Sequence, residues 1–340
     1  MTSARRPGGG DSSAQGPDGG GCPEGRDGPG GPSPADGGSG GDSGDGFGFE
    51  AHRSRLFGLA YRMLGSAEEA EDTVQDAYLR WNGADRPSVT HPGAWLAKVV
   101  TNLCLNRLTS ARARREEYIG PWLPEPVLTG GGALGPLESA EQRDSVSMAV
   151  LVLLERLTPV ERAVYVLREA FGYGHREIAE VLDLGEANCR QLHRRAVGRI
   201  KARESRFEPG PGQWDGLVES FLTAAREGDL AGLEKILARD ATWWSDGGGL
   251  RGIARRPVLG RERVARFMVG APDGTPGVLA GLRLVRAEVN GAPAVLALAD
   301  GALAAVGVLD IREGRVRGVY AVLNPGKLTH LARRWAAAGH

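Results

Sequence analysis

The sequence predicts a multidomain fold: two all-α domains, a helical bundle and a helix-turn-helix, followed by an α+β domain. Apolar residues at helical spacing between 50 and 108 predict the bundle. A helix, a glycine-containing turn and a second helix within 175–200 predict the helix-turn-helix. After further helices, Asn-Gly, Asp-Gly and Glu-Gly turns join four strand-like runs, at 282–290, 293–299, 302–311 and 315–323. Helices followed by such an antiparallel meander indicate an α+β domain.

Composition sets the broad class. The 340 residues allow two or three domains, and a hydrophobic content of 41% supplies their cores. The formal net charge is zero, so bulk charge does not identify a partner. Three cysteines without metal-ligand spacing indicate a reduced chain without structural disulfides or zinc. With no apolar run near the roughly 18–20 residues of a membrane span and no signal-peptide pattern, we expect a cytoplasmic protein without membrane contact.

Composition shifts also divide the chain. Glycine, serine, proline and aspartate dominate residues 1–48, which we expect to form a disordered tail. The remaining boundaries are expected at 49–115 for the bundle, 116–136 for a linker, 137–206 for the helix-turn-helix, 213–327 for the α+β domain and 328–340 for a C-terminal tail.

A helix expected at about 67–81 carries an acidic stripe. Asp72, Gln75, Asp76 and Leu79 follow the i, i+3, i+4, i+7 spacing opposite the predicted core face. An acidic stripe is typical of solvated surface, but an apolar residue in its middle is typical of a partner-binding ridge. Both interpretations remain open on these residues.

A cationic strip follows on the next helix. Lys98, Asn102 and Asn106 lie at i, i+4, i+8, and Arg107, Arg112, Arg114 and Arg115 follow without an intervening acid. Cations suit phosphates and amides suit base edges, so the strip is typical of a surface for single-stranded or distorted DNA. The alternative, an arginine-rich helix end that complements the helix dipole, explains only one or two of these charges.

The helix-turn-helix has a basic second helix. Arg190, Gln191, Arg194 and Arg195 lie opposite its apolar arc. Arginine pairs with guanine and glutamine with adenine in the DNA major groove, so this face predicts DNA binding. The alternative is a helical hairpin with a solvated basic face.

The linker contains an unusual apolar motif. Trp122, Leu123, Pro124, Glu125 and Pro126 form the stiff sequence W-L-P-E-P. An exposed Trp-Leu pair is unfavourable, so we expect both side chains to pack against the C-terminal domain.

One carboxylate stands beside a glycine run in the α+β domain. Asp246 precedes three glycines, and no second acid or histidine is expected beside it. A lone carboxylate is thin support for acid-base catalysis, and the three glycines favour a special turn that Asp246 caps.

Four motifs in order resemble an extracytoplasmic-function (ECF) sigma factor of RNA polymerase. They are AEDTVQDAYLR at 70–80, AWLAKVVTNLCLNRL at 94–108, LTPVERAVYVLRE from 157 and EIAEVL from 177. The resemblance implies that Asp72, Gln75 and Asp76 dock on the core polymerase. It implies that loop 82–92 with Asn102, Asn106 and Arg107 recognises and melts the −10 promoter element, and that Arg190, Gln191, Arg194 and Arg195 recognise the −35 element.

Two segments precede the meander, GDLAGL at 228–233 and RPVLGRERV at 256–264. With the meander they resemble a SnoaL-like cone, a curved sheet wrapped by helices around a pocket. One sigma subfamily fuses this cone to its end and carries WLPEP, DGGGK and NPDK motifs. Here WLPEP is intact, whereas Leu250 replaces the lysine of the second motif and Gly326 the aspartate of the third. The resemblance implies an intramolecular regulatory contact that involves residues 122–126, Asp246 and Asn324.

The leading hypothesis is therefore a sigma factor with a built-in regulator. Its expected partners are core RNA polymerase and promoter DNA, with a small ligand of the cone left open, and no cofactor or metal is expected. One alternative is a ligand-sensing DNA-binding regulator that does not engage polymerase. Another is an isomerase or hydrolase with a DNA-binding appendage, whose turnover would depend on Asp246; we expect no enzyme.

Overall fold

The computed structural model describes residues 46–129, 145–201, 214–250, 253–270 and 276–337. The side chains of 46, 47, 111–116 and 201 are outside this description. Most of the expected N-terminal tail also lies outside it. The first helix begins at Gly46, so the last three residues assigned to the tail are helical.

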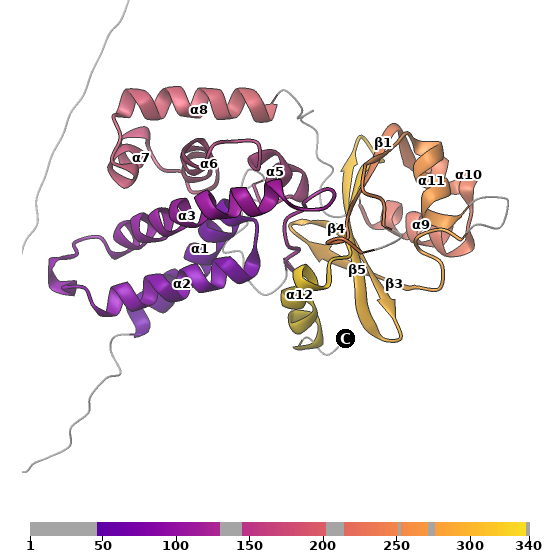
Figure 1. Cartoon of the computed structure of the whole chain (residues 1–340), viewed down its shortest axis with the longest axis horizontal. Helices are drawn as coiled ribbons and strands as arrows, with labels where there is room; N and C mark the ends of the chain where they lie inside the picture. Colours follow the sequence, from indigo (N-terminus) through magenta and orange to yellow (C-terminus); the bar gives the residue numbers. More distant parts are fainter. Residues whose placement is uncertain (1–45, 130–144, 202–213, 251–252, 271–275, 338–340) are drawn as a thin grey trace, which may run out of the picture. The chain divides into compact units, whose positions relative to one another are not determined.

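Three helices form the first helical domain (Figure 1). They are α1 (Gly46–Leu64), α2 (Ala67–Asn82) and α3 (Pro92–Glu116), with a short 3-10 turn at Arg86–Ser88. Gly65 ends α1 with a φ of 68°, which costs little without a Cβ. The Ser66 side chain then accepts a hydrogen bond from the Glu69 N–H and starts α2, as its capping pattern predicts.

The second helical domain contains the predicted helix-turn-helix. Its elements are α5 (Met148–Leu154), α6 (Pro159–Tyr165), a π-helical turn (Val166–Ala170), α7 (His175–Leu182) and α8 (Glu186–Lys201). Thr158 and Glu161 form the capping box that begins α6. Asp183 ends α7 in the left-handed conformation, with a φ of 52°. We also expect a helix over about 137–156; residues 130–144 lie outside the described residues, and the described helix begins at Met148, where the Ser147 side chain accepts a hydrogen bond from the Val150 N–H.

The two helical domains share one buried core. Apolar side chains from α1, α2, α3, α5, α6, α7 and α8 form a single cluster. Two buried arginines reinforce it: Arg62 donates to Ser145 Oγ at 2.8 Å, and Arg162 donates to the Met63 carbonyl at 2.7 Å. Burial lowers the pKa of Arg62 to about 10, so this guanidinium still carries its charge at neutral pH. The interface between these domains is therefore both apolar and hydrogen-bonded.

The C-terminal domain is the predicted α+β fold. Its helices are α9 (Trp214–Glu227), α10 (Leu230–Ile236), α11 (Arg261–Val269) and α12 (Pro325–Ala337). Its strands are β1 (Leu237–Asp246), β2 (Val258–Leu259), β3 (Arg283–Val289), β4 (Ala292–Ala299), β5 (Ala302–Arg312) and β6 (Arg315–Val322). The sheet order is β2-β1-β6-β5-β4-β3, with β1 and β6 parallel and the other pairs antiparallel.

The three predicted hairpin turns are confirmed. Asn290-Gly291, Asp300-Gly301 and Glu313-Gly314 each have positive φ at both positions, as a type I′ turn requires. These turns connect β3 to β6 into the predicted meander.

Both faces of this sheet are apolar and covered. Helices α9, α10 and α11 lie on one face (Figure 1), where they enclose the core that includes Trp243 and Leu309. On the opposite face, Leu296, Val306 and Val322 form a second cluster with Leu123 of the linker. Coverage on both sides explains why β4 is a nearly continuous apolar run rather than an alternating one.

The expected C-terminal tail at 328–340 is wrong for most of its length. Helix α12 continues to Ala337 and buries Leu328 and Leu331 in the second sheet cluster. Leu328, Leu331 and Trp335 follow the i, i+3, i+7 spacing of an amphipathic helix. The predicted boundary instead followed the end of the motif at 324–327, so this short helical pattern was assigned to the tail. No helix in the described ranges is both long and apolar enough to cross a bilayer.

Candidate functional site

The acidic ridge, which we define as Asp72, Gln75, Asp76 and Leu79, lies on the outer face of α2. Leu79 is 60% exposed, which is unusual for a leucine in the middle of a charged stripe. Arg107 of α3 donates to Asp76 Oδ2 at 2.7 Å, and it lies 3.8 Å from Asp72 Oδ2. Arg107, which the resemblance assigns to the −10 surface, is therefore paired with the ridge in this structure.

The cationic strip on α3 contacts the helix-turn-helix. Lys98 Nζ donates to the Glu180 carbonyl at 2.8 Å and to Asp183 Oδ1 at 3.0 Å. Asn102 is half-buried and Asn106 is exposed on the same helix. The side chain of Arg112 lies outside the described residues. Lys98, at the start of the expected −10 surface, is thus hydrogen-bonded to the C-terminal end of α7.

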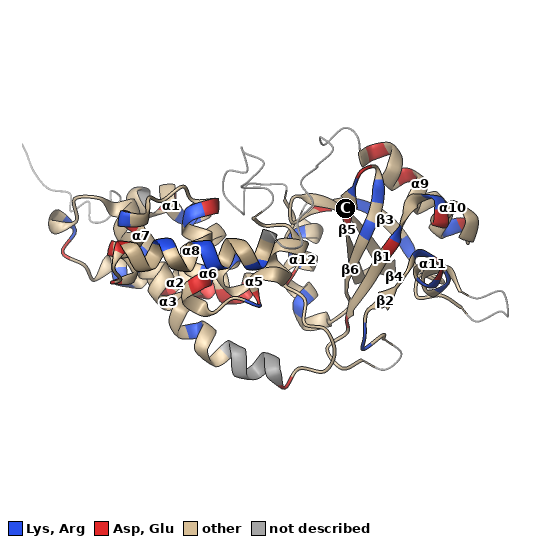
Figure 2. Ribbon diagram, turned by 90° about the horizontal axis from the view of Figure 1, so that it is seen from above, with Lys and Arg blue, Asp and Glu red and all other residues tan. Residues whose placement is uncertain are grey.

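The basic face of α8 is exposed. Arg190, Gln191, Arg194 and Arg195 all point to solvent, and Figure 2 shows basic residues (blue) spaced along this helix. Arg190 forms an ion pair with Glu186 one turn earlier, at 2.9 Å. On the opposite side, Cys189, Ala196 and Ile200 are buried in the shared helical core, which fixes the direction of the basic face.

The linker motif at 122–126 is fastened to the C-terminal domain by a buried ion pair. Asp246 Oδ2, fully buried at the end of β1, accepts from the Leu123 N–H at 2.8 Å and from Lys327 Nζ at 2.7 Å. Lys327 also donates to the Leu123 carbonyl at 2.6 Å, and its ammonium lies 4.1 Å from the centre of a Trp122 ring. The predicted packing of Trp122 and Leu123 on this domain is present; its regulatory role stays a prediction.

Two further polar side chains complete this cluster. Tyr118 donates a short hydrogen bond to Asp246 Oδ1, and Asn324 Nδ2 donates to the Tyr118 oxygen at 2.8 Å. Burial and the adjacent carboxylate raise the pKa of Tyr118, so its hydroxyl remains protonated. We name Tyr118, Leu123, Asp246, Asn324 and Lys327 the linker clip.

The other half of the motif is fastened to the first helical domain. Glu125 Oε2 accepts from the Ala67 N–H at 2.8 Å and the Glu68 N–H at 3.2 Å, at the positive end of α2. Tyr61 Oη donates to the Glu125 carbonyl at 2.6 Å. Burial raises the pKa of the Glu125 carboxyl. The prolines flank this contact, and both are buried.

A second connection joins the linker to the β3–β4 turn. The Asn290 side chain accepts from the Val127 N–H at 3.1 Å, and it donates to the Tyr61 oxygen at 2.6 Å and the Val146 carbonyl at 2.9 Å. One buried side chain therefore touches the linker and both helical domains. The linker lies between three domains and is hydrogen-bonded to two of them on either side of Pro124.

Sequence reasoning missed Tyr118, Lys327, Asn290 and Tyr61 as parts of this cluster. Lys327 is the last residue of NPGK at 324–327, the counterpart of the NPDK motif, and this position could have marked it as the partner of Asp246. Asn290 was recognised only as a turn residue. Tyr61 and Tyr118 carried no signal, because their partners lie far away in the chain, at separations of 229 residues for Tyr61–Asn290 and 128 for Tyr118–Asp246.

Comparison with known proteins identifies both helical domains. The model of Sigma-70 region 2 matches residues 49–114, and that of Sigma-70 region 4 matches residues 147–200. Fold and site thus define a sigma-70-type protein.

The relatives extend over most of the chain. "ECF RNA polymerase sigma factor SigJ" of Mycobacterium tuberculosis is 37% identical, over 83% of this chain and 92% of its own length. "Probable ECF RNA polymerase sigma factor SigI" of the same species is 33% identical, over 83% of this chain and 94% of its own length. The crystal structure of SigJ matches with a TM-score of 0.66 at 34% identity, over 83% of this chain and 97% of that one.

This chain therefore belongs to the family of ECF RNA polymerase sigma factors, and it acts in transcription initiation with core RNA polymerase and promoter DNA. Those relatives are sigma factors, not enzymes.

Proposed function

We propose that the C-terminal domain of this sigma factor regulates promoter use by holding the linker between the two DNA-binding domains. The linker clip is the observation that carries this proposal. Asp246 accepts a hydrogen bond from the Leu123 N–H, and Lys327 donates one to the Leu123 carbonyl. The Leu123 side chain is fully buried on the sheet. Burial of a leucine stabilises such a contact by about 1.5–3 kcal/mol.

The clip controls a distance that the promoter demands. The −10 and −35 elements are named for nominal positions about 25 base pairs apart, which corresponds to about 85 Å of duplex at ~3.4 Å per pair. Lys98 of the −10 surface is hydrogen-bonded to Asp183 and Glu180 of the −35 domain. Both surfaces cannot occupy their elements while this contact holds, so the described arrangement is a closed form that must open on the promoter.

Three surfaces then carry the contacts of the open form. The acidic ridge docks on the core polymerase, the α3 strip binds the −10 element, and the basic face of α8 enters the major groove of the −35 element. Exposed Leu79 supports the docking role of the ridge. Replacement of Asp72 and Asp76 by Asn should reduce core polymerase binding in a pull-down assay. The matched replacement Glu219→Gln on α9, also an exposed acid, should leave it unchanged.

The C-terminal domain, in this proposal, performs no catalysis. Its buried carboxylate, Asp246, is occupied by the linker and Lys327, which leaves no free base at that position. As a polymerase subunit, the protein works in the cytoplasm. The alternative of a DNA-binding regulator that does not engage polymerase has no observation in its favour.

Transcription from a purified promoter library with core polymerase tests the regulatory role. Leu123→Ala removes the buried side chain and should cost the clip about 2–5 kcal/mol, so linker release should raise promoter output. Leu250→Ala is the matched control, because Leu250 lies four residues after Asp246 in the chain but is 45% exposed. Equal output from Leu123→Ala and the unchanged chain would contradict regulation through the clip. If neither the unchanged chain nor any variant initiates transcription, the contacts assigned to the three surfaces are contradicted instead.

A further inference from the structure

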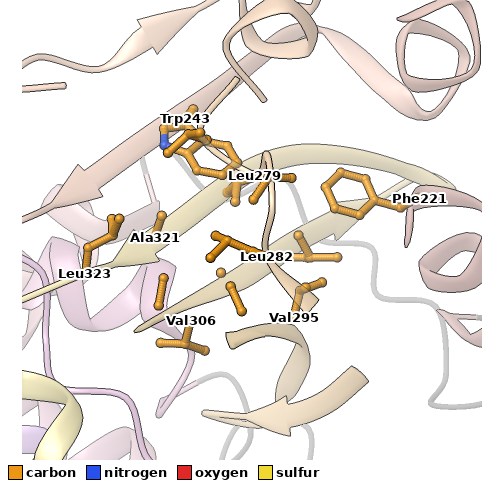
Figure 3. Close-up of a pocket in the computed structure, with 14 residues that line it drawn as sticks. Phe221, Trp243, Leu279, Leu282, Val295, Val306, Ala321 and Leu323 are labelled. Carbon is orange, nitrogen blue, oxygen red and sulfur yellow. The ribbon is translucent and has the colours of Figure 1, made fainter. Parts of the chain in front are cut away.

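A pocket separate from the linker clip lies inside the C-terminal domain. It occupies the face of the sheet that α9 and α11 cover, and it encloses an empty volume of about 470 Å³ that includes its opening to solvent. Phe221 of α9, Trp243 of β1 and the segment that contains Leu279 and Leu282 close it from one side (Figure 3). Val295 of β4 and residues of β5 and β6 form the floor.

The lining has almost no polar chemistry. Among its described residues, the only side-chain nitrogen or oxygen is Trp243 Nε1, which already donates to Ser245 Oγ at 2.7 Å. The floor strands use their main-chain groups in the sheet, where Gly307 pairs with both Val295 and Ala321. A polar or charged ligand atom in this space would lose its water without finding a partner. None of the described lining residues is titratable, so they supply no acid or base.

We propose that this pocket binds a compact, neutral, hydrocarbon-like molecule. Shape and the exclusion of water would supply the affinity, because the described walls offer dispersion contacts and their one polar side-chain atom, Trp243 Nε1, is already hydrogen-bonded. The lining also defines what is excluded: carboxylates, phosphates, amines and polyhydroxylated molecules.

The pocket shares two residues with the support of the linker clip. Leu323 lines the pocket, and its N–H donates to the Asp246 carbonyl at 2.7 Å. Val306 lines the pocket and belongs to the buried cluster that contains Leu123. An occupant would press on both residues and stabilise the sheet in its clip-bound shape. This consequence rests on the proposed regulatory function, whereas ligand binding itself does not.

Calorimetric titration of the full chain with naphthalene and with 1-naphthoate tests the binding step. The two probes share a ring system and differ in one carboxylate. Naphthalene should bind one per chain and raise the midpoint of thermal unfolding, and naphthoate should bind at least ~10-fold more weakly, since its charge finds no partner. Equal affinity for both probes, or no binding of naphthalene near its solubility limit, would overturn the proposal.

Filling the pocket provides the matched variants. Ala297→Leu and Ala305→Leu place extra carbons in the space from β4 and β5, and each should weaken naphthalene binding by at least ~10-fold. Ala302→Leu lies exposed on the same strand as Ala305 and should bind as the unchanged chain does. Gly307→Ala serves if the larger variants do not fold, because its new Cβ would meet Val319 at an ordinary 3.5 Å. Naphthalene binding that none of these filling variants weakens would place the probe elsewhere and sink the assignment.

Hydrogen exchange separates this proposal from the regulatory one. Naphthalene should slow exchange of the Leu123 amide if occupancy reaches the clip. Calorimetric binding without slower exchange would retain the pocket but overturn its coupling to the linker.

Discussion

Asp246 is the residue on which the contact between linker and C-terminal domain depends. Its side chain is fully buried, and the Lys327 side chain beside it is 10% exposed. A buried ion pair adds little net stability, but loss of one partner leaves a charge without compensation. The four donors around Asp246, from Tyr118, Leu123, Gly248 and Lys327, show that its carboxylate is a structural acceptor.

Asp246→Asn should therefore open the clip. The substitution keeps the shape of the side chain but leaves the Lys327 ammonium without a counter-charge, at a cost of roughly 3–5 kcal/mol. The opening free energy measured by hydrogen exchange at the Leu123 amide should fall by about this amount. Addition of Lys327→Met should recover part of the loss, because the remaining charge is removed.

Asp240→Asn is the control for this prediction. Asp240 lies on the same strand and pairs with Arg317 at 2.7 Å, but its side chain is 67% exposed. Loss of an exposed pair costs less than ~1 kcal/mol. If Asp246→Asn changes the exchange of Leu123 no more than Asp240→Asn does, the clip does not depend on the ion pair.

At the scale of elements, the proposed DNA surface lies on α8 and not on α7. The buried residues of α8 direct Arg194 and Arg195 outward, and no ion pair to either is present among the described side chains. Arg176 of α7 is also exposed, at 84%, but it pairs with Glu180 along its own helix. These two helices therefore supply a test and its control.

Arg194→Ala and Arg195→Ala should each weaken promoter binding about 10- to 100-fold where the guanidinium contacts a base, and less where it contacts phosphate. Titration of a promoter duplex, measured by fluorescence anisotropy at fixed salt, gives the affinity. Arg176→Ala should have little effect. A loss from Arg176→Ala equal to that from either α8 variant would place the DNA surface elsewhere.

Helix α12 contacts the first helical domain through a buried histidine. His330 stacks on Phe57, and its Nδ1 lies 3.4 Å from Glu71 Oε1 of α2. Its Nε2 is buried and finds no hydrogen-bond partner among the described residues. Burial is the largest cause that lowers the pKa of His330; the Glu71 carboxylate opposes this shift, and the positive charges of Arg334 and Arg333 add to it.

This lowered pKa predicts that acid weakens the α12 contact. The undocked histidine binds a proton more readily than the docked one, so stability is fully present above the ordinary pKa of 6.5 and is lost as the pH falls through the folded value. As the pH is lowered from 7.5 to 5.5, the amides of α12 should therefore lose protection relative to the intrinsic exchange rate of an unprotected amide at each pH. His330→Phe should flatten this dependence, and His91→Gln, at an exposed position, should not. An unchanged profile in His330→Phe would exclude His330 as its cause.

For the molecule as a whole, the Lys98–Asp183 ion pair offers a test of the proposed closed form and its opening. Lys98 Nζ and Asp183 Oδ1 are 3.0 Å apart, a distance suited to amide formation by a water-soluble carbodiimide. The free protein should give this cross-link, detected by peptide mapping, and Asp183→Asn should abolish it. The yield should fall when core polymerase and promoter DNA are added, because the two DNA-binding domains must separate.

An unchanged cross-link yield in the promoter complex would contradict opening. Polymerase without DNA provides the intermediate case. A fall at that stage would show that polymerase binding opens the protein, and a fall only with DNA would assign opening to the promoter.

Much of the fold and part of the site follow from local sequence. The Ser66 cap, the end of α7 before Asp183 and the three Gly-containing hairpins depend on neighbours a few residues away, and all were predictable. Helix α12 was not predicted, because its stability comes from burial against a sheet that is distant in sequence. The exposure of Leu79 and of the α8 arginines also followed from helical period alone.

The sequence by itself determined the family, the element order and which faces of α2, α3 and α8 remain polar. Only the tertiary structure decided what those faces and the linker touch. Arg107 pairs with the ridge, Lys98 reaches across 85 residues to Asp183, and Lys327 reaches across 204 residues to the Leu123 carbonyl. Periodicity and capping are set within a turn or two of chain, whereas the partner of a long cationic side chain depends on how whole domains pack.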